Sequence, residues 1–290
     1  MLTHLNYKLD SKIIPYVMQK SWVPISRISQ INEKRTNHVD IASIFGDPKS
    51  ISIVKLDEEY KVINDICPHR QELIFNVNVK NGIIKCPYHS NKLNVNEMES
   101  YPVFTEDGLL FINMSNEDIT PPNIFKGYGN ERERIVQGQY DINSGAFDVI
   151  ESILNSMSEK CKKRNPYNIN HFISTNMYNY DYRSSGKRTP TRVSNGFDGA
   201  FSVFSHNHFG ENLESYTKVR VYVMPISEYR SRIFWSTSRN FMINPTLDYV
   251  VNCMVSDTYK DSIVKKNKSS LINHDWLINR YRNQIHNMRE

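Results

Sequence analysis

The first part of the chain has the apolar pattern of a short helix followed by an all-β domain. Residues 1–20 carry apolar side chains at a loose helical spacing, which Pro15 interrupts. From residue 21 onward, short runs rich in β-branched residues alternate with turn residues, which is typical of strands. The clearest runs are SISIVKL, KVINDI, GIIKCPYH and GLLFINMS. We therefore expect a helical segment at 1–20 and an all-β domain at 21–115.

The second part of the chain has the pattern of an α+β domain. The polar segment NEDITPPNIFKGYGNERER, with two prolines and two glycines, predicts a linker at 116–138. Helical spacing of apolar residues follows in FDVIESILNSMSEKCKK, and returns in TLDYVVNCMVSDTYKDSIVKK and HDWLINRYRNQIHNM. Alternating segments between these helices, such as YTKVRVYVMPI, predict antiparallel strands. The sequence therefore predicts an α+β domain with an antiparallel sheet at 139–290.

Composition limits the classes of protein to which the chain can belong. Hydrophobic residues make up 39% of the 290 residues, which is enough for a core. The apolar runs are much shorter than a membrane span, and the N-terminus lacks an uninterrupted apolar segment. Four cysteines, two of them close to histidines, do not suggest a disulfide framework. We expect a cytoplasmic protein with no membrane partner.

The net charge of +5 is modest, and basic residues cluster in EKCKKRNPYN and SSGKRTPTR. A solvated basic face is the simplest interpretation of these clusters, and a docking surface for an acidic redox partner is the alternative. The sequence has neither helix-turn-helix nor zinc-finger spacing, so we expect no nucleic acid partner.

Two short boxes, CPHR and CPYH, each combine one cysteine with one histidine. Cys67 and His69 are separated by one residue, and Cys86 and His89 by two. Zinc fingers pair cysteine with cysteine and histidine with histidine, whereas here each box supplies one of each. This mixing suits a two-iron cluster in which one iron takes thiolates and the other takes imidazoles. A zinc-stabilised or metal-free ligand-binding protein is the alternative.

The sequence CPHR…CPYHS resembles the paired boxes of Rieske [2Fe–2S] proteins. The resemblance implies that Cys67 and Cys86 ligate one iron and that His69 and His89 ligate the other. Rieske proteins of respiratory complexes have an additional cysteine in each box, which this sequence lacks. The single-cysteine boxes resemble those of Rieske oxygenases and Rieske ferredoxins, and a ferredoxin would end near residue 115.

The C-terminal part resembles the catalytic domain of Rieske non-haem iron oxygenases, in the branch of vanillate demethylase and pheophorbide a oxygenase. The similar segments are YVMPISEYRSRIFWSTSRNF, YKDSIVKK and HDWLINRYRNQI. The resemblance implies an α+β fold class, with an all-β Rieske domain followed by a helix-grip-like domain that contains an antiparallel sheet. It also implies a trimer in which the cluster of one chain faces the iron of the next. A ferredoxin or a flavin reductase would donate the electrons.

The mononuclear iron motif of this family has no full counterpart in the sequence. Family members hold this iron with two histidines on a helix and one carboxylate. In ESILNSMSEKCKK, Glu151 matches the family glutamate, but Asn155 replaces the bridging aspartate, and Ser158 and Lys163 replace the two histidines. Serine is a poor iron ligand, and a lysine ammonium has no lone pair. We therefore expect the histidine motif to be lost.

Other residues offer an incomplete replacement for this motif. Asp261 matches the family's carboxylate ligand, and His171 follows the helix closely enough to reach the same cavity. His206 and His208 share one side of an expected strand near a hairpin end, where we expect surface positions. A mononuclear Fe(II) site would depend on Asp261 and His171, with the two strand histidines as further alternatives.

Two redox functions follow from these residues. The first is an oxygenase-derived protein that keeps the [2Fe–2S] cluster and transfers electrons, alone or as a partner of a catalytically intact oxygenase subunit in a homo- or hetero-trimer. The alternative is an active Rieske mono- or dioxygenase that hydroxylates or demethylates a small organic substrate at a non-standard iron site. We favour the first because the aspartate and both histidines are replaced together.

Overall fold

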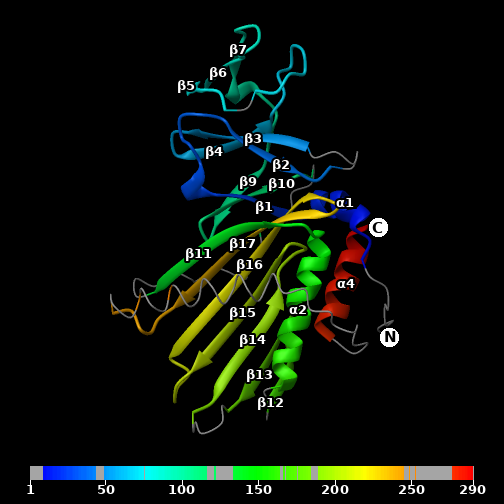
Figure 1. Ribbon diagram of the computed structural model, residues 1–290, viewed down its shortest axis with the longest axis vertical. Coiled ribbons are helices and arrows are strands. Elements are labelled where there is room, and N and C mark those ends of the chain that lie inside the picture. The colour runs from blue at the N-terminus through cyan, green and yellow to red at the C-terminus, as the bar shows by residue number, and fades with distance from the viewer. Residues whose placement is uncertain are drawn as a thin grey trace.

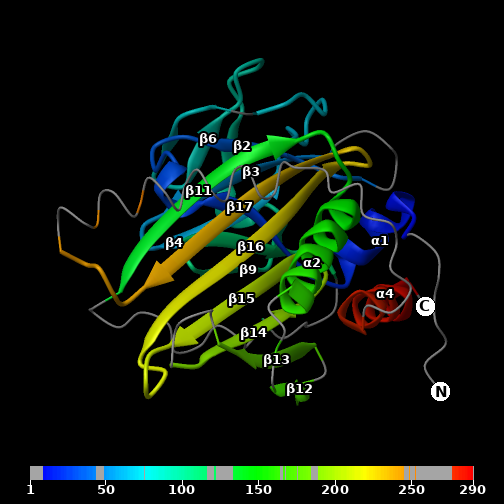
Figure 2. The same ribbon diagram turned by 60° about the horizontal axis from the view of Figure 1, so that its bottom comes forward.

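The computed structural model has an upper part made of small sheets and a lower part built on one large sheet (Figure 1). Two long helices lie against one side of the large sheet, close to the short N-terminal helix (Figure 2). The structure describes residues 9–43, 49–74, 76–115, 121, 133–163, 166, 168–174, 176–183, 189–244, 248, 252 and 276–289.

The upper part contains three small antiparallel sheets. In spatial order their strands are β1 (Trp22–Arg27), β10 (Leu109–Asn113) and β9 (Val103–Glu106); β2 (Asn37–Ile41), β3 (Lys49–Leu56), β4 (Glu59–Asn64) and β8 (Ser100–Tyr101); and β5 (Val79–Lys80), β6 (Ile83–Lys85) and β7 (Lys92–Asn94). The short helices are η1 (Ser11–Ile13), α1 (Ile14–Gln19), η2 (Ile28–Gln30) and η3 (Val95–Glu97). Strand β10 is buried along its whole length, which explains its run of apolar residues.

In its described residues, the lower part contains an antiparallel sheet of seven strands and two long helices. In spatial order the strands are β11 (Arg134–Ile142), β17 (Arg230–Arg239), β16 (Ser215–Ser227), β15 (Ser202–Phe209), β14 (Thr191–Phe197), β13 (Met177–Tyr182) and β12 (Asn168–Ser174). The helices are α2 (Ala146–Lys163) and α4 (Trp276–Arg289). Within the described residues, no helix is both long and apolar enough to cross a membrane.

The predicted order of an all-β part followed by an α+β part with an antiparallel sheet is confirmed. The predicted helices near the N-terminus and at the end of the chain correspond to α1 and α4. Strand β11 begins at Arg134, inside the range 116–138 that the sequence assigns to a linker. The helix predicted for TLDYVVNCMVSDTYKDSIVKK falls almost entirely outside the described residues.

Alternation along the strands gives the large sheet two faces with different neighbours. Arg220, Tyr222 and Ser236 point to the side that meets the turn between β9 and β10, and we call this side the hairpin face. Phe197 points to the opposite side, which we call the helix face, and its ring centroid lies 5.3 Å from that of Tyr281 on α4. Because paired strands align residue with residue, their register assigns each sheet residue to one face.

The turn between β9 and β10 joins the two parts of the molecule. The Asp107 carboxylate accepts hydrogen bonds from the hydroxyls of Tyr222 and Ser236, each at 3.2 Å, and lies 3.6 Å from Arg220 Nη1. Burial raises the pKa of Asp107, and the positive charge of Arg220 offsets part of this effect. The Gln137 amide also donates to the main-chain carbonyl of Asp107 at 3.0 Å. The large sheet therefore holds both the side chain and the backbone of this turn.

A buried arginine at the end of β1 makes a second connection. Nη2 of Arg27 donates to the carbonyl of Gly138 at 2.8 Å and to that of Trp235 at 2.6 Å. These two residues are direct partners in the pairing of β11 with β17. The guanidinium also lies 5.9 Å from the ring centroid of Phe234. One side chain of the upper part thus binds two strands of the large sheet.

Gly138 is required where β11 passes the indole of Trp235. A Cβ atom at residue 138 would lie 2.4 Å from Trp235 Cζ2, closer than side chains approach each other. We expect Gly138→Ala to lower the free energy of unfolding by about 1–3 kcal/mol, because the buried ring must shift to make room. Urea unfolding measures this loss. The loss should be smaller in a Trp235→Phe background, and equal losses in both backgrounds would contradict the clash.

Buried apolar side chains of the described residues form two separate cores. The larger core runs without interruption from the upper sheets into the large sheet and its helices, and includes Ile51, Phe111, Tyr222, Phe147 and Tyr281. The smaller core lies around the two Cys–His boxes. Its buried members are Val54, Ile63, Cys67, Ile74, Ile84, Cys86 and Val95.

Candidate metal centre

The first box forms a closed loop after strand β4. The N–H of Cys67 donates to the carbonyl of Glu72 at 2.7 Å, and the N–H of Gln71 donates to the carbonyl of Cys67 at 2.8 Å. Gln71 has a φ of 59°, a left-handed conformation that few residues other than glycine adopt. Two main-chain hydrogen bonds and one left-handed residue therefore fix the shape of this loop.

The second box repeats the same loop after strand β6. The N–H of Cys86 donates to the carbonyl of Asn91 at 2.8 Å, and the N–H of Ser90 donates to the carbonyl of Cys86 at 3.0 Å. Ser90 has a φ of 58° and, like Gln71, lies four residues after its cysteine. The chain therefore builds two matching loops from two different sequences.

The two loops bring together all four side chains that the sequence singles out. Cys67 and Cys86 are 2% and 1% exposed, and their thiols are hydrogen-bonded to each other. The rings of His69 and His89 are exposed, with centroids 5.3 Å apart and planes at 76°. The thiol pair is buried and the imidazole pair is exposed, which suits a cluster with an inner iron on sulfur and an outer iron on nitrogen.

The surroundings of Cys86 favour the thiolate that a metal requires. Burial raises the pKa of this thiol, but the main-chain N–H groups of Tyr88 and His89 and the thiol of Cys67 act in the opposite direction. Their combined effect leaves the pKa of Cys86 below its ordinary value. Main-chain N–H groups that favour a thiolate would also favour cluster sulfur, because both carry negative charge.

A buried carboxylate, two residues before Cys67, binds the start of the first loop to strands β2 and β3. Asp65 is fully buried, and its carboxylate accepts a hydrogen bond from the Ser52 hydroxyl at 2.8 Å and lies 2.6 Å from Nδ1 of His38. Its main-chain N–H also donates to the carbonyl of Ser50 at 3.2 Å. Asp65 is not among the residues predicted from the sequence. Its only signal is a charged residue between an apolar strand and the first cysteine.

Comparison with known families agrees with this geometry. Residues 21–99 match the Rieske [2Fe-2S] domain family, and the match includes both boxes and both loops. Residues 21–99 form a Rieske [2Fe–2S] domain. The match supports the expected [2Fe–2S] cofactor, whereas the assignment of Cys67, His69, Cys86 and His89 as its ligands stays a prediction.

Solved structures with the same fold extend beyond the Rieske domain. The Pseudomonas putida CBB5 NdmA QL mutant with theobromine has a TM-score of 0.72 and 13% identity, covering 95% of this chain and 91% of that one. Dicamba monooxygenase bound to dicamba has a TM-score of 0.69 and 12% identity, covering 94% and 98%. Dicamba monooxygenase with non-heme iron and dicamba has a TM-score of 0.68 and 12% identity, covering 94% and 97%. Over about 95% of its length the chain therefore has the fold of Rieske non-haem iron oxygenases. A search of curated protein sequences found no match.

The residues expected at the oxygenase iron site lie on the inner side of α2. Asn155 and Ser158 are 7% and 9% exposed, on the buried stripe of a helix that contacts β15 and β16. Asn155 Nδ2 donates to Glu159 Oε1 at 3.4 Å. The stripe continues the spacing of the buried residues Phe147, Ile150, Leu154 and Cys161. An amide and a hydroxyl therefore occupy buried positions on this side of α2.

Glu151 has a clear partner on the neighbouring helix. Its carboxylate accepts two parallel hydrogen bonds from Arg282 on α4, Nε to Oε1 and Nη2 to Oε2, each at 2.7 Å. The side chains of Glu151 and Arg282 are 12% and 5% exposed. This bidentate pair joins α2 to α4, so Glu151 has a structural role in this chain.

The structure corrects the placement of the two strand histidines. His206 is 7% exposed, so the expectation of a surface position is wrong for this residue. It pairs with Lys218 and shares the hairpin face with His208, on the opposite side of the sheet from α4. Burial and the nearby charges of Arg220 and Lys218 lower the pKa of His206 to about 3, so it is neutral at pH 7. Neither histidine can complete a site on the helix face.

The other proposed ligands are only partly described. His171 lies on β12, the edge strand of the large sheet, and its side chain is outside the described part of the structure. The same is true of the Lys163 side chain, and Asp261 falls outside the described residues altogether. Among the side chains that are described, no three of His, Cys, Asp or Glu gather around one ion position. A Rieske cluster does not require such a group of three, because each of its two irons takes only two protein ligands.

Proposed function

We propose that the protein is an electron-transfer component of a Rieske oxygenase system, which holds the [2Fe–2S] cluster and carries no catalytic iron. The observation that supports this proposal is the burial of Asn155 and Ser158 on the inner side of α2, at positions that the sequence resemblance assigns to the bridging aspartate and to one iron-binding histidine. Neutral amide and hydroxyl oxygens are much weaker ligands for Fe(II) than imidazole and carboxylate.

Four residues would hold the cluster, with Cys67 and Cys86 on the buried iron and His69 and His89 on the outer iron. When bound, a cluster of this type accepts and donates one electron at a time. The chain keeps the two thiols away from water and leaves both imidazole rings at the surface. The imidazoles are therefore the shortest route by which an electron enters or leaves.

The surface around the imidazoles suits contact with another protein. Tyr88 is 54% exposed, Ile66 is 40% exposed and Leu73 is 38% exposed, and all three belong to the two loops or flank them. Exposed apolar side chains gathered at one end of a molecule are typical of interaction sites. The partners that we infer are a ferredoxin or flavin reductase as donor and a catalytically intact oxygenase subunit as acceptor, in a homo- or hetero-trimer.

An active oxygenase is the second candidate function. It is favoured by the fold, which matches dicamba monooxygenase with non-heme iron over 94% of this chain. In that case the iron ligands would have to include Asp261 and His171, and the substrate would be a small organic molecule to be hydroxylated or demethylated.

Iron and acid-labile sulfide content separates the two functions. We expect anaerobically purified protein to contain about two irons and two sulfides per chain, with a Rieske EPR signal after reduction by dithionite. Added Fe(II), followed by gel filtration, should not raise the iron content. Inductively coupled plasma spectrometry and a colorimetric sulfide assay give both numbers.

A third iron that survives gel filtration would contradict the proposal and favour the active oxygenase. Colourless protein that contains zinc would contradict both redox functions. The variant Ser158→His serves as a positive control, because it adds one histidine of the kind that the family uses to the inner side of α2. The variant should bind added Fe(II) more tightly than the parent protein does.

A further inference from the structure

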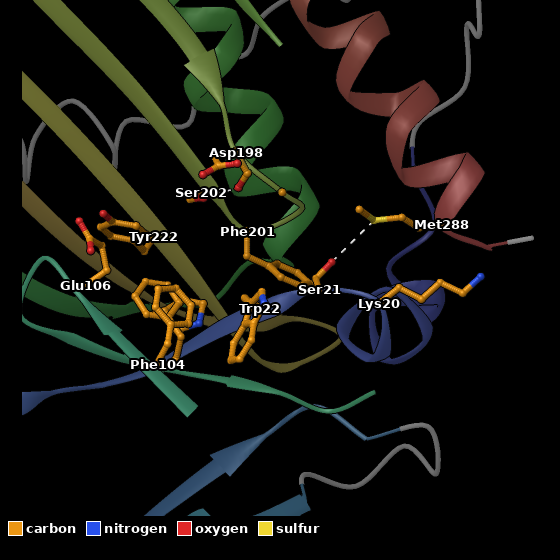
Figure 3. Close-up of a pocket in the computed structure, with 13 residues that line it drawn as sticks. Lys20, Ser21, Trp22, Phe104, Glu106, Asp198, Phe201, Ser202, Tyr222 and Met288 are labelled. Carbon is orange, nitrogen blue, oxygen red and sulfur yellow. Dashed lines mark hydrogen bonds between the residues drawn. The ribbon is translucent and has the colours of Figure 1, made fainter. Parts of the chain in front are cut away.

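A cavity of about 170 Å³ lies between the upper part of the molecule and the large sheet (Figure 3). Strands β1, β9 and β10 supply one side of the cavity, and the turn between β14 and β15, strand β16 and the end of α4 supply the other. It opens on the hairpin face of the sheet, because its lining includes Tyr222. The cavity is therefore lined by no residue of α2 or of the Rieske boxes, although Phe201 in its lining stacks on Phe147 of α2.

Aromatic rings form one wall of this cavity. Trp22 and Phe104 meet edge to face with centroids 4.8 Å apart, and Phe104 stacks on Phe111 at 4.7 Å. Phe111 meets Tyr222 edge to face at 5.5 Å, which continues the series across to the large sheet. The faces of such rings carry partial negative charge and attract cations.

Two carboxylates line the same cavity. Asp198 belongs to the turn between β14 and β15, and its Oδ2 atom is buried without a hydrogen bond from the described residues. Burial raises the pKa of Asp198 to about 6. Burial also raises the pKa of Glu106, with a partial offset from Arg220. Both shifts reflect carboxylates whose negative charge the protein compensates only in part.

The basic residue that lines the cavity does not compensate them. Lys20 is exposed, and Figure 3 shows its side chain directed away from the aromatic rings and from both carboxylates. In the same view Glu106 lies beside Tyr222 and close to Phe104, whereas Asp198 lies beside Ser202, on the side opposite Trp22 and Phe104. The cavity therefore combines an aromatic wall with two carboxylates, one on each of its two sides.

We propose that this cavity binds a small organic ammonium ion, with the ammonium group at the carboxylates and the apolar body against the aromatic rings. An apolar cavity of about 150 Å³ accommodates benzene, so a ligand the size of benzylamine fits this one. An anion would meet two carboxylates, and a neutral ligand would leave them uncompensated. A bound ammonium ion would touch both parts of the molecule at once.

Calorimetric titration of the cluster-containing protein tests this proposal with two probes of matched size. Benzylamine is an ammonium ion at pH 7.5, whereas benzyl alcohol has a similar shape without the charge. We expect benzylamine to bind at one site per chain, at least about tenfold more tightly than benzyl alcohol, because a hydrogen bond between charged groups adds this much. Equal affinity for both probes, or no binding of benzylamine, would overturn the proposal.

Isosteric variants locate the site. Asp198→Asn and Glu106→Gln should each weaken benzylamine binding by about tenfold and leave benzyl alcohol unaffected. Glu211→Gln, at an exposed position in the turn after β15, is the matched control and should change neither affinity. An unchanged visible spectrum and melting temperature verify that each variant is folded. If both cavity variants bind benzylamine as the parent protein does, the amine binds elsewhere and the proposal is wrong.

Discussion

We expect Cys86→Ser to abolish the Rieske EPR signal and the visible absorption of the [2Fe–2S] cluster. Cys86 is 1% exposed, and the main-chain N–H groups of Tyr88 and His89 favour its thiolate form, the form that binds a metal. A serine hydroxyl in the same place stays protonated and is a poor ligand for this iron. Visible spectroscopy, EPR after reduction, and iron and sulfide assays on the purified variant measure the loss.

Cys161→Ser is the matched control for this experiment. Cys161 is also a buried cysteine outside any disulfide, 9% exposed, but it lies on α2 in the other part of the molecule. The control variant should keep the full iron content and an unchanged EPR spectrum. A cluster that survives Cys86→Ser, or one that is lost in Cys161→Ser, would mean that the ligand assignment is wrong.

The second large effect concerns the ion pair between α2 and α4. Arg282→Met should lower the free energy of unfolding by about 3–5 kcal/mol, because it leaves the Glu151 carboxylate buried without its partner. Glu151 lies one helical turn before Asn155, so the loss should also loosen the inner side of α2. Urea unfolding followed by circular dichroism measures the change.

Two further variants give this prediction its controls. Arg230→Met removes a more exposed ion pair, in which the side chains of Arg230 and Asp141 are 54% and 30% exposed. This variant should lower the free energy of unfolding by less than about 1 kcal/mol. The double variant Glu151→Leu/Arg282→Met removes both buried charges and should recover most of the lost stability. If Arg230→Met and Arg282→Met lower the free energy of unfolding by similar amounts, burial does not explain the stabilising effect of the pair between Glu151 and Arg282.

The sequence predicted those features that depend on neighbouring residues. The Cys–His spacing predicted the Rieske boxes because both loops are closed by short-range hydrogen bonds, as between Cys67 and Glu72. Alternation predicted the strands of the large sheet, and helical spacing predicted α2 and α4. The position of Asn155 and Ser158 on the buried side of α2 follows from the same periodicity.

Features that depend on the register between distant strands were not predicted. His206 was expected at the surface because a single strand does not reveal what covers each of its sides. The contacts of Asp107 with Tyr222 and of Arg27 with Gly138 join residues more than a hundred positions apart. Asp65 depends on partners from β2 and β3. None of these contacts leaves a pattern in the local sequence.

The division of the apolar core has a consequence for how the molecule opens. Sheets β1–β10–β9 and β2–β3–β4–β8 share their core with the large sheet, whereas the box loops and sheet β5–β6–β7 rest mainly on the smaller core. Hydrogen exchange would therefore follow two cooperative units, and their boundary passes through the Rieske domain itself. The cluster-bearing tip can open as a subglobal unit while the remainder of the Rieske domain stays closed on the oxygenase-like sheet.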